Sequence, residues 1–138
     1  MVFGWLMLLG CTGVLPPNIP NVPVDQTIFI FDAQYAALQG VGGYAELPGG
    51  SRGILVFRVS IDRFNAYEMH CPYESSGTCG RVRPDDTGLF LVDDDCGGDG
   101  CGSRFNIIDG SVVSGPSFYP LVQYQVVLSG QGILRVFN

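Results

Sequence analysis

The sequence predicts a small all-β domain, built as an antiparallel sandwich or a partly open barrel. Short runs of β-branched and aromatic residues recur along the chain, and 20 glycines and 9 prolines mark frequent turns between them. No stretch of about ten residues shows the hydrophobic period of a helix. With 46% hydrophobic and 14% charged residues, the 138-residue chain is expected to form one domain with a packed core.

The expected elements follow one another at short intervals along the chain. Strands are predicted where β-branched and aromatic residues gather: 26–32, 53–60, 64–70, 81–83, 89–93, 104–108, 111–114, 121–128 and 133–137. Turn signals separate them at 61–63, 84–88, 109–110 and 130. Residues 33–39 are expected to form a helical turn and residues 40–53 a glycine-rich connection. Two loops, 71–80 and 94–103, are expected to project from strand ends.

The charge pattern excludes one class of partner and gives little support to catalysis. The net charge is −6, and the seven basic residues, all arginine, do not cluster, so nucleic acid is not an expected partner. No apolar run approaches the ~18–20 residues that a membrane-spanning helix needs. The chain has one histidine, His70, and no Ser/His/Asp constellation, so we do not expect an enzyme.

The first ten residues resemble a bacterial lipoprotein signal. They read MVFGWLMLLG and end at Cys11, whose thiol would take a diacylglycerol after cleavage. A basic residue before the apolar stretch is missing, and the alternative is an ordinary first strand with a buried cysteine. The resemblance implies lipidation at Cys11, export to the cell envelope on the periplasmic or cell-surface side, and a membrane partner bound through the lipid.

The residues after Cys11 are expected to form a tether. Residues 11–24 contain four prolines and almost no charge, which favours an extended chain over a central strand or a helix. The predicted organisation is therefore a signal segment at 1–10, the lipidated cysteine and tether at 11–24, and the β domain at 25–138.

Four further cysteines fall in the two predicted loops, each at the end of a hairpin arm. They are Cys71, Cys79, Cys96 and Cys101. Two pairs of cysteines on two facing loops is an arrangement that metal and cluster sites use.

The second half of the chain, from about residue 67 to 137, resembles a Rieske domain. H-C-P-Y resembles the first loop of that family, and C-G-S-R-F-N-I-I-D-G resembles its second loop with the D-G turn that follows. G-P-S-F-Y-P-L-V-Q-Y-Q-V matches the family's Gly-Pro segment and the alternating strand after it. The resemblance implies a Rieske-like fold.

The ligand positions depart from the family pattern. Cys71 matches the first cysteine ligand, but Tyr73 and Cys101 stand where the two histidines belong. The second cysteine ligand falls near Gly98, unless an insertion makes Cys96 its counterpart. A Rieske cluster needs two histidines on one iron, and one histidine cannot supply both. A standard Rieske centre is therefore excluded.

Three interpretations of the cysteines and their surroundings stay open. In an exported domain, neighbouring thiols oxidise, and four cysteines allow three connectivities between which the sequence does not choose. If Cys96 is the counterpart of the second cysteine ligand, the resemblance implies the pairs Cys71–Cys96 and Cys79–Cys101. Alternatively, the four cysteines hold zinc or an all-cysteine 2Fe–2S cluster, with His70 as a possible additional ligand and electron transfer as the activity. The third is calcium on the acidic loop D-D-D-C-G-G-D-G.

We favour the disulfide interpretation. It predicts a non-catalytic structural or binding module without a cofactor, which would meet a protein partner at the cysteine-loop tips.

Overall fold

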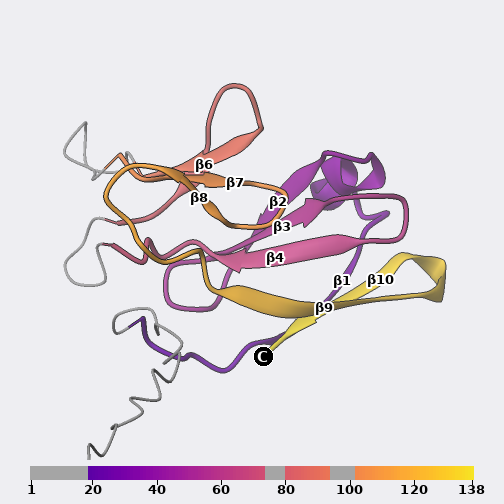
Figure 1. The fold of residues 1–138 in the computed structure, drawn as a ribbon. Coiled ribbons are helices and arrows are strands. Elements are labelled where there is room, and N and C mark those ends of the chain that lie inside the picture. Colours follow the sequence, from indigo (N-terminus) through magenta and orange to yellow (C-terminus); the bar gives the residue numbers. More distant parts are fainter. Residues whose placement is uncertain (1–18, 74–79, 94–101) are drawn as a thin grey trace, which may run out of the picture.

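The computed structural model describes residues 19–73, 80–93 and 102–138, and these form a mostly β structure (Figure 1). The described strands are β1 (Asp25–Phe29), β2 (Tyr44–Leu47), β3 (Ile54–Arg58), β4 (Phe64–Glu68), β5 (Arg83–Pro84), β6 (Phe90–Val92), β7 (Arg104–Asn106), β8 (Val112–Ser114), β9 (Gln123–Ser129) and β10 (Ile133–Phe137). Two 3-10 helices, η1 (Ala33–Gln39) and η2 (Gly130–Gly132), follow β1 and β9. The all-β class predicted from the sequence is confirmed.

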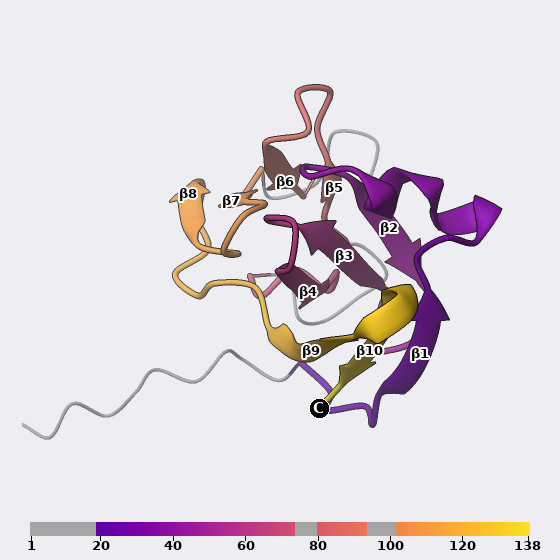
Figure 2. The ribbon, with the colours of Figure 1, turned by 90° about the vertical axis from the view of Figure 1, so that its right-hand side faces the viewer.

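The strands form two antiparallel sheets. One has six strands in the order β1-β10-β9-β4-β3-β2, and the other has four in the order β5-β6-β7-β8. The six-stranded sheet curls into an incomplete barrel, as its arc of strands in Figure 2 shows. Its edge strands β1 and β2 are bridged at one end, where the Gln26 side chain donates to the carbonyl of Pro48. This sheet corresponds to the partly open barrel that was predicted.

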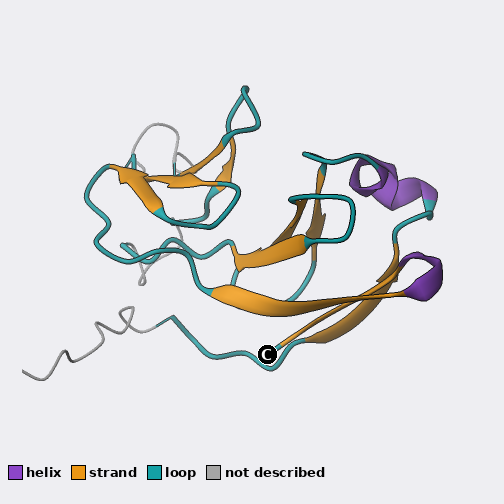
Figure 3. Cartoon of the chain, turned by 45° about the vertical axis from the view of Figure 1, so that its right-hand side comes forward, coloured by secondary structure: helices purple, strands orange, loops and turns teal. Residues whose placement is uncertain are grey.

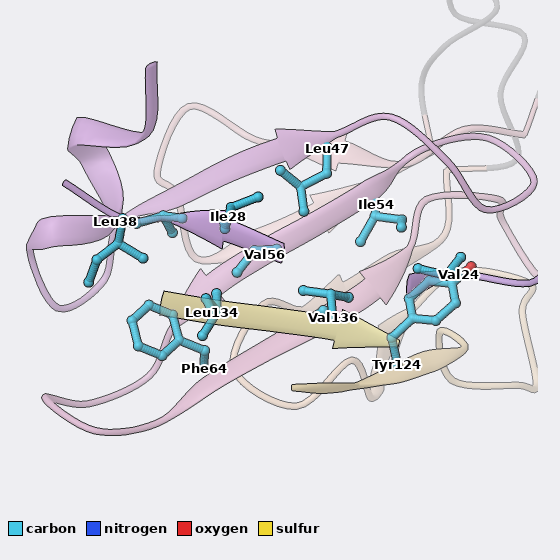
Figure 4. Packing of buried hydrophobic residues seen from close by; sticks show 12 residues of the cluster. Val24, Ile28, Leu38, Leu47, Ile54, Val56, Phe64, Tyr124, Leu134 and Val136 are labelled. Carbon is cyan, nitrogen blue, oxygen red and sulfur yellow. The ribbon is translucent and has the colours of Figure 1, made fainter. Parts of the chain in front are cut away.

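A first hydrophobic core fills the inside of the curled sheet (Figure 4). Alternate residues of the strands point inward, as the period of two in a strand requires. The side chains in this core that are fully buried or nearly so are Val24, Ile28, Ile30, Leu38, Leu47, Ile54, Val56, Phe64, Ala66, Tyr124, Leu134 and Val136. Leu38 comes from η1, which explains why this short helix is held against the barrel.

A second hydrophobic core lies between the outside of β3 and β4 and the four-stranded sheet. The intervening residues of β3 and β4, Leu55, Phe57 and Tyr67, belong to this core. Leu91 of β6 and Phe105 of β7 face them from the other sheet. Figure 3 shows the two sheets side by side. Because β3 and β4 are buried on both faces, they are the centre of the molecule.

One expected connection is in part a strand. Residues 40–53 were predicted to be a glycine-rich connection, but Tyr44–Leu47 pairs with β3 as β2. That prediction was wrong for these four residues because their polar outer face and flanking glycines hide a short edge strand. Residues 33–39 form the helical turn that was predicted.

The end of the segment that was expected to be a tether lies along the body. Val24 is buried in the first core, and its N–H donates to the side chain of Asn138 at 2.9 Å. The Asn138 amide also donates to the carbonyl of Val22 at 2.8 Å. Within the described ranges, no helix has the length and apolar character to cross a membrane.

Candidate functional site

Both cysteine loops are rooted at one end of the four-stranded sheet. Arg83 at the start of β5 pairs with Val92 at the end of β6, and Val92 pairs in turn with Arg104 at the start of β7. The first loop therefore returns to the sheet beside the point where the second loop leaves it. Reciprocal backbone hydrogen bonds close the second loop, from Asp93 N to Ser103 O at 3.0 Å and from Gly102 N to Asp93 O at 3.1 Å.

Cys71 lies at the root of the first loop and is part of the second core. Its side chain is fully buried, among neighbours that include Met69 and Val82. Its backbone N–H donates to the carbonyl of Gly80, which brings the two ends of the loop together. The other three loop cysteines, Cys79, Cys96 and Cys101, and the proposed lipid site Cys11 lie outside the described residues. The convergence of four cysteines therefore stays a prediction.

His70 points away from the side of the chain that carries Cys71. Neighbouring residues of an extended chain direct their side chains to opposite faces. His70 is buried, and its Nδ1 lies 2.8 Å from the hydroxyl of Ser51. Its backbone N–H donates to Glu68 Oε1 at 3.0 Å. The structure thus connects the imidazole to the loop between β2 and β3, while the Cys71 thiol faces the second core.

Tyr73 occupies the position where the Rieske resemblance expects the first histidine. Half of its surface is exposed. A phenol in place of an imidazole cannot provide the neutral nitrogen ligand of a Rieske iron. Among the described residues, no three His, Cys, Asp or Glu side chains come together as a possible metal site. The residues present do not fit a two-histidine, two-cysteine cluster.

A buried carboxylate network supports the root of the first loop, and sequence reasoning missed it. Glu68 is almost fully buried. Its carboxylate accepts hydrogen bonds from the backbone N–H groups of Ser51 and Arg52, at 2.7 and 2.9 Å. The Tyr124 hydroxyl donates to Glu68 Oε2 at 2.7 Å. Burial, reinforced by this hydrogen bond and by the nearby carboxylate, raises the pKa of Tyr124 well above its usual range.

Gly50 is required at its position beside this network. Its φ of +62° lies in the left-handed region, which favours glycine. A Cβ there would collide with Glu68 Oε2 and would lie 2.6 Å from the Tyr124 hydroxyl. The glycine-rich segment before β3 therefore wraps the carboxylate through its backbone, and it holds Ser51 against His70.

The Gly-Pro segment forms a third loop at the same end of the molecule. Gly115 has a φ of +92°, and a Cβ there would lie 2.6 Å from the Cα of Ser103. The Ser117 N–H donates to Ser103 Oγ at 3.1 Å, and its hydroxyl donates to the Tyr119 carbonyl at 2.9 Å. These contacts fix the loop against the end of the second cysteine loop. Phe118 at its tip is 91% exposed.

Comparisons with known proteins support the fold. No family model matches the chain, and no curated protein matches it in sequence. The ferredoxin of carbazole 1,9a-dioxygenase from Nocardioides aromaticivorans IC177 superposes with a TM-score of 0.51 at 16% identity, over 83% of this chain and 95% of that one.

Two further solved structures are more distant in shape. A chain from a complex of reduced oxygenase and oxidized ferredoxin in carbazole 1,9a-dioxygenase gives a TM-score of 0.48 at 23% identity, over 70% of this chain and 82% of that one. A putative NADH-dependent nitrite reductase small subunit from Mycobacterium tuberculosis gives 0.48 at 16% identity, over 86% and 97%. The Nocardioides match establishes a Rieske-like ferredoxin fold for this chain.

Proposed function

We propose that this chain is an exported, lipid-anchored protein of the cell envelope whose Rieske-like domain is a non-catalytic binding module with disulfide-closed loops. Cys11 carries the lipid, and Cys71, Cys79, Cys96 and Cys101 form two disulfides. The loop tips meet a protein partner. The module has no cofactor and is not an enzyme.

The observation that carries the proposal is the arrangement of side chains around Cys71. Its thiol is enclosed in an apolar core, the imidazole of His70 is held on the opposite side by Ser51, and the expected histidine position is an exposed tyrosine, Tyr73. A buried cysteine at the base of a glycine-rich loop is a suitable origin for a disulfide, which would contribute about 2–4 kcal/mol. In an exported protein the oxidising compartment favours that outcome.

Phe118 supports a role in binding. Phe118 is 91% exposed, and a partner that covered its ring would remove a large apolar surface from water. The loop that presents it is fixed by Gly115, Ser103 and Ser117, so little conformational entropy is lost when a partner covers it. Its loop contacts Ser103 at the end of the second cysteine loop, which supports a binding role for this end of the domain.

The first test is thiol and metal analysis of the full chain, expressed with its own N-terminus and purified from the envelope of a bacterial host. We expect a mass without residues 1–10 and with a lipid on Cys11. Alkylation without reductant should modify no cysteine, whereas after reduction it should modify four. Metal analysis should find neither iron nor zinc.

The alternative is an electron carrier, or a zinc protein, with an altered ligand set. The chain has the fold of a ferredoxin. Among redox roles, this similarity favours electron transfer. Two irons per chain, a brown colour and visible absorbance would make the four cysteines cluster ligands, and one zinc per chain would make them a zinc site. Either result would overturn the disulfide proposal, and Cys71→Ser and His70→Ala variants would then test which side chains bind the metal.

A further inference from the structure

The outer face of β1, β10 and β9 is an exposed surface that no described part of the chain covers. The strand registers align its nine residues in three rows: Asp25–Phe137–Gln125, Thr27–Arg135–Val127 and Phe29–Ile133–Ser129. All nine are solvent-exposed except Phe137, which is partly buried. We call these nine residues the outer face.

One end of the outer face is apolar and aromatic. Phe29 and Ile133 are directly opposite each other and are 42% and 39% exposed. Phe31 follows β1, is 56% exposed, and meets the Phe29 ring edge-on with centroids 5.3 Å apart. Val127, in the middle row, is 49% exposed. A contiguous group of this kind is a candidate contact surface.

The outer face is electrically neutral although the chain is acidic. Its only charged residues are Asp25 and Arg135, which form a bidentate ion pair at 2.9 and 3.0 Å. The Arg135 guanidinium also lies over the Phe137 ring, 4.4 Å from its centroid. The whole chain has a net charge of −6, so much of its remaining surface would be repelled by anionic lipid headgroups. The nine residues of the outer face carry no net charge, and the one carboxylate that the described part of the chain places beside their apolar end is that of Asp32, which lines a pocket with Phe29 and Ile133.

The chain that leads to the proposed lipid anchor leaves the body at the Asp25–Phe137 end of the outer face, the end opposite Phe29 and Ile133. Residues 19–24 run below β9 and β10 in Figures 1 and 3, next to Asn138 at the end of β10. From Ile19 to Cys11 is eight residue steps, which span at most roughly 28 Å. A domain held this close to a bilayer meets the lipid surface at a high effective concentration, so even weak contacts form.

From these observations we propose that the outer face rests on the lipid bilayer, with Phe29, Phe31, Val127 and Ile133 entering the headgroup region. The inference rests on the proposed lipid anchor. In this orientation the glutamine, serine and threonine side chains of the face meet the polar headgroups, while the four apolar side chains lose contact with water. The proposal therefore assigns the outer face as the surface that the anchored protein turns to the membrane.

The test is tryptophan quenching by brominated lipids in vesicles of phosphatidylethanolamine and phosphatidylglycerol. The only tryptophan of the chain is Trp5, which cleavage before Cys11 would remove, and a Trp5→Phe background excludes a signal from any uncleaved chain. Val127→Trp then reports on the outer face, and Phe118→Trp, on the loop beside the cysteine-loop roots, is the matched control. Both positions are exposed, so both variants should fold. The lipidated full chain is used throughout.

We expect bromine to quench the fluorescence of the Val127→Trp variant at least twofold more than that of the Phe118→Trp variant. Equal or stronger quenching in the Phe118→Trp variant would overturn the orientation. A chain that floats with the vesicles but shows no quenching at position 127 would overturn the bilayer contact and leave the anchor intact. If the mass of the particle in solution also rose with protein concentration, a second copy of the chain would be the occupant of the outer face. A chain without lipid mass that does not float would overturn both the anchor and this inference.

Discussion

At the scale of single residues, Gly50 shows how the backbone near the candidate site is constrained. Gly50→Ala forces an L side chain into the left-handed region and into the Glu68–Tyr124 hydrogen bond. We expect a loss of roughly 2–4 kcal/mol in the free energy of unfolding, measured by urea titration. Gly40→Ala is the matched control. Its φ is −107° and its Cβ would meet nothing within 4 Å, so its effect should stay within about 0.5 kcal/mol. Equal effects at the two positions would contradict the steric argument.

The buried hydroxyl of Tyr67 should make the free energy of unfolding fall at alkaline pH. Burial raises the pKa of Tyr67 to about 12, against the opposing hydrogen bond from Asn65. The unfolded chain releases this proton near pH 10 and the folded chain retains it. The contribution of Tyr67 to stability is therefore complete below pH 10 and is lost as the pH rises from 10 to 12, by at most about 1.4 kcal/mol per pH unit.

The measurement is the free energy of unfolding against pH in the wild type and in Tyr67→Phe. Phenylalanine keeps the ring in the second core and removes the titrating hydroxyl, so the difference between the two curves isolates Tyr67. The wild-type curve should fall more steeply above pH 10. Parallel curves would mean that the hydroxyl titrates alike in the folded and unfolded chains.

At the scale of elements, most strands were predictable from the sequence because each has a strong local pattern. The I-L-V-F run forms most of β3, the first two residues of the I-F-I-F run end β1, which stops at Phe29 where the prediction continued to residue 32, and the turn at Asp109-Gly110 separates β7 from β8. β2 was not predictable in this way. Its four residues, Tyr44–Leu47, have one buried side chain and lie between glycines, and only the pairing with β3 makes them a strand.

The candidate site was less predictable than the strands. The sequence identified Cys71 and His70 as neighbours, but it did not show that their side chains would diverge. The Glu68 network did leave a signal: in F-N-A-Y-E-M-H the charged residue follows the same alternation as Phe64 and Ala66, which places it on the face of β4 that is turned to the first core. A buried carboxylate needs donors, and the glycine-rich segment at 49–53 was available to provide them. The pairing of that segment with β4 is non-local, so the partners could not be named.

At the scale of the whole molecule, the two described ends of the chain are joined. The Asn138 side chain binds Val22 and Val24, and its amide donates a third, longer hydrogen bond to the side chain of Asn21 at 3.3 Å. This connection fixes the point on the body from which the proposed tether would leave, at the end of β10. Without it, about five residues from 19 onward would be added to the proposed tether, which would lengthen it by up to roughly 17 Å.

Asn138→Ala should release residues 21–24 from the end of β10 and leave the barrel intact. It removes three side-chain hydrogen bonds and keeps the backbone bond from Asn138 N to Val24 O, so we expect a loss of about 1–2 kcal/mol. Hydrogen exchange should show faster exchange at the Val24 amide and unchanged protection in β3 and β4. Asn106→Ala is the control, because its side chain accepts only a local bond from Ile108 N at 2.9 Å. Unchanged exchange at Val24 in Asn138→Ala would show that packing in the first core, and not Asn138, holds the chain at this point.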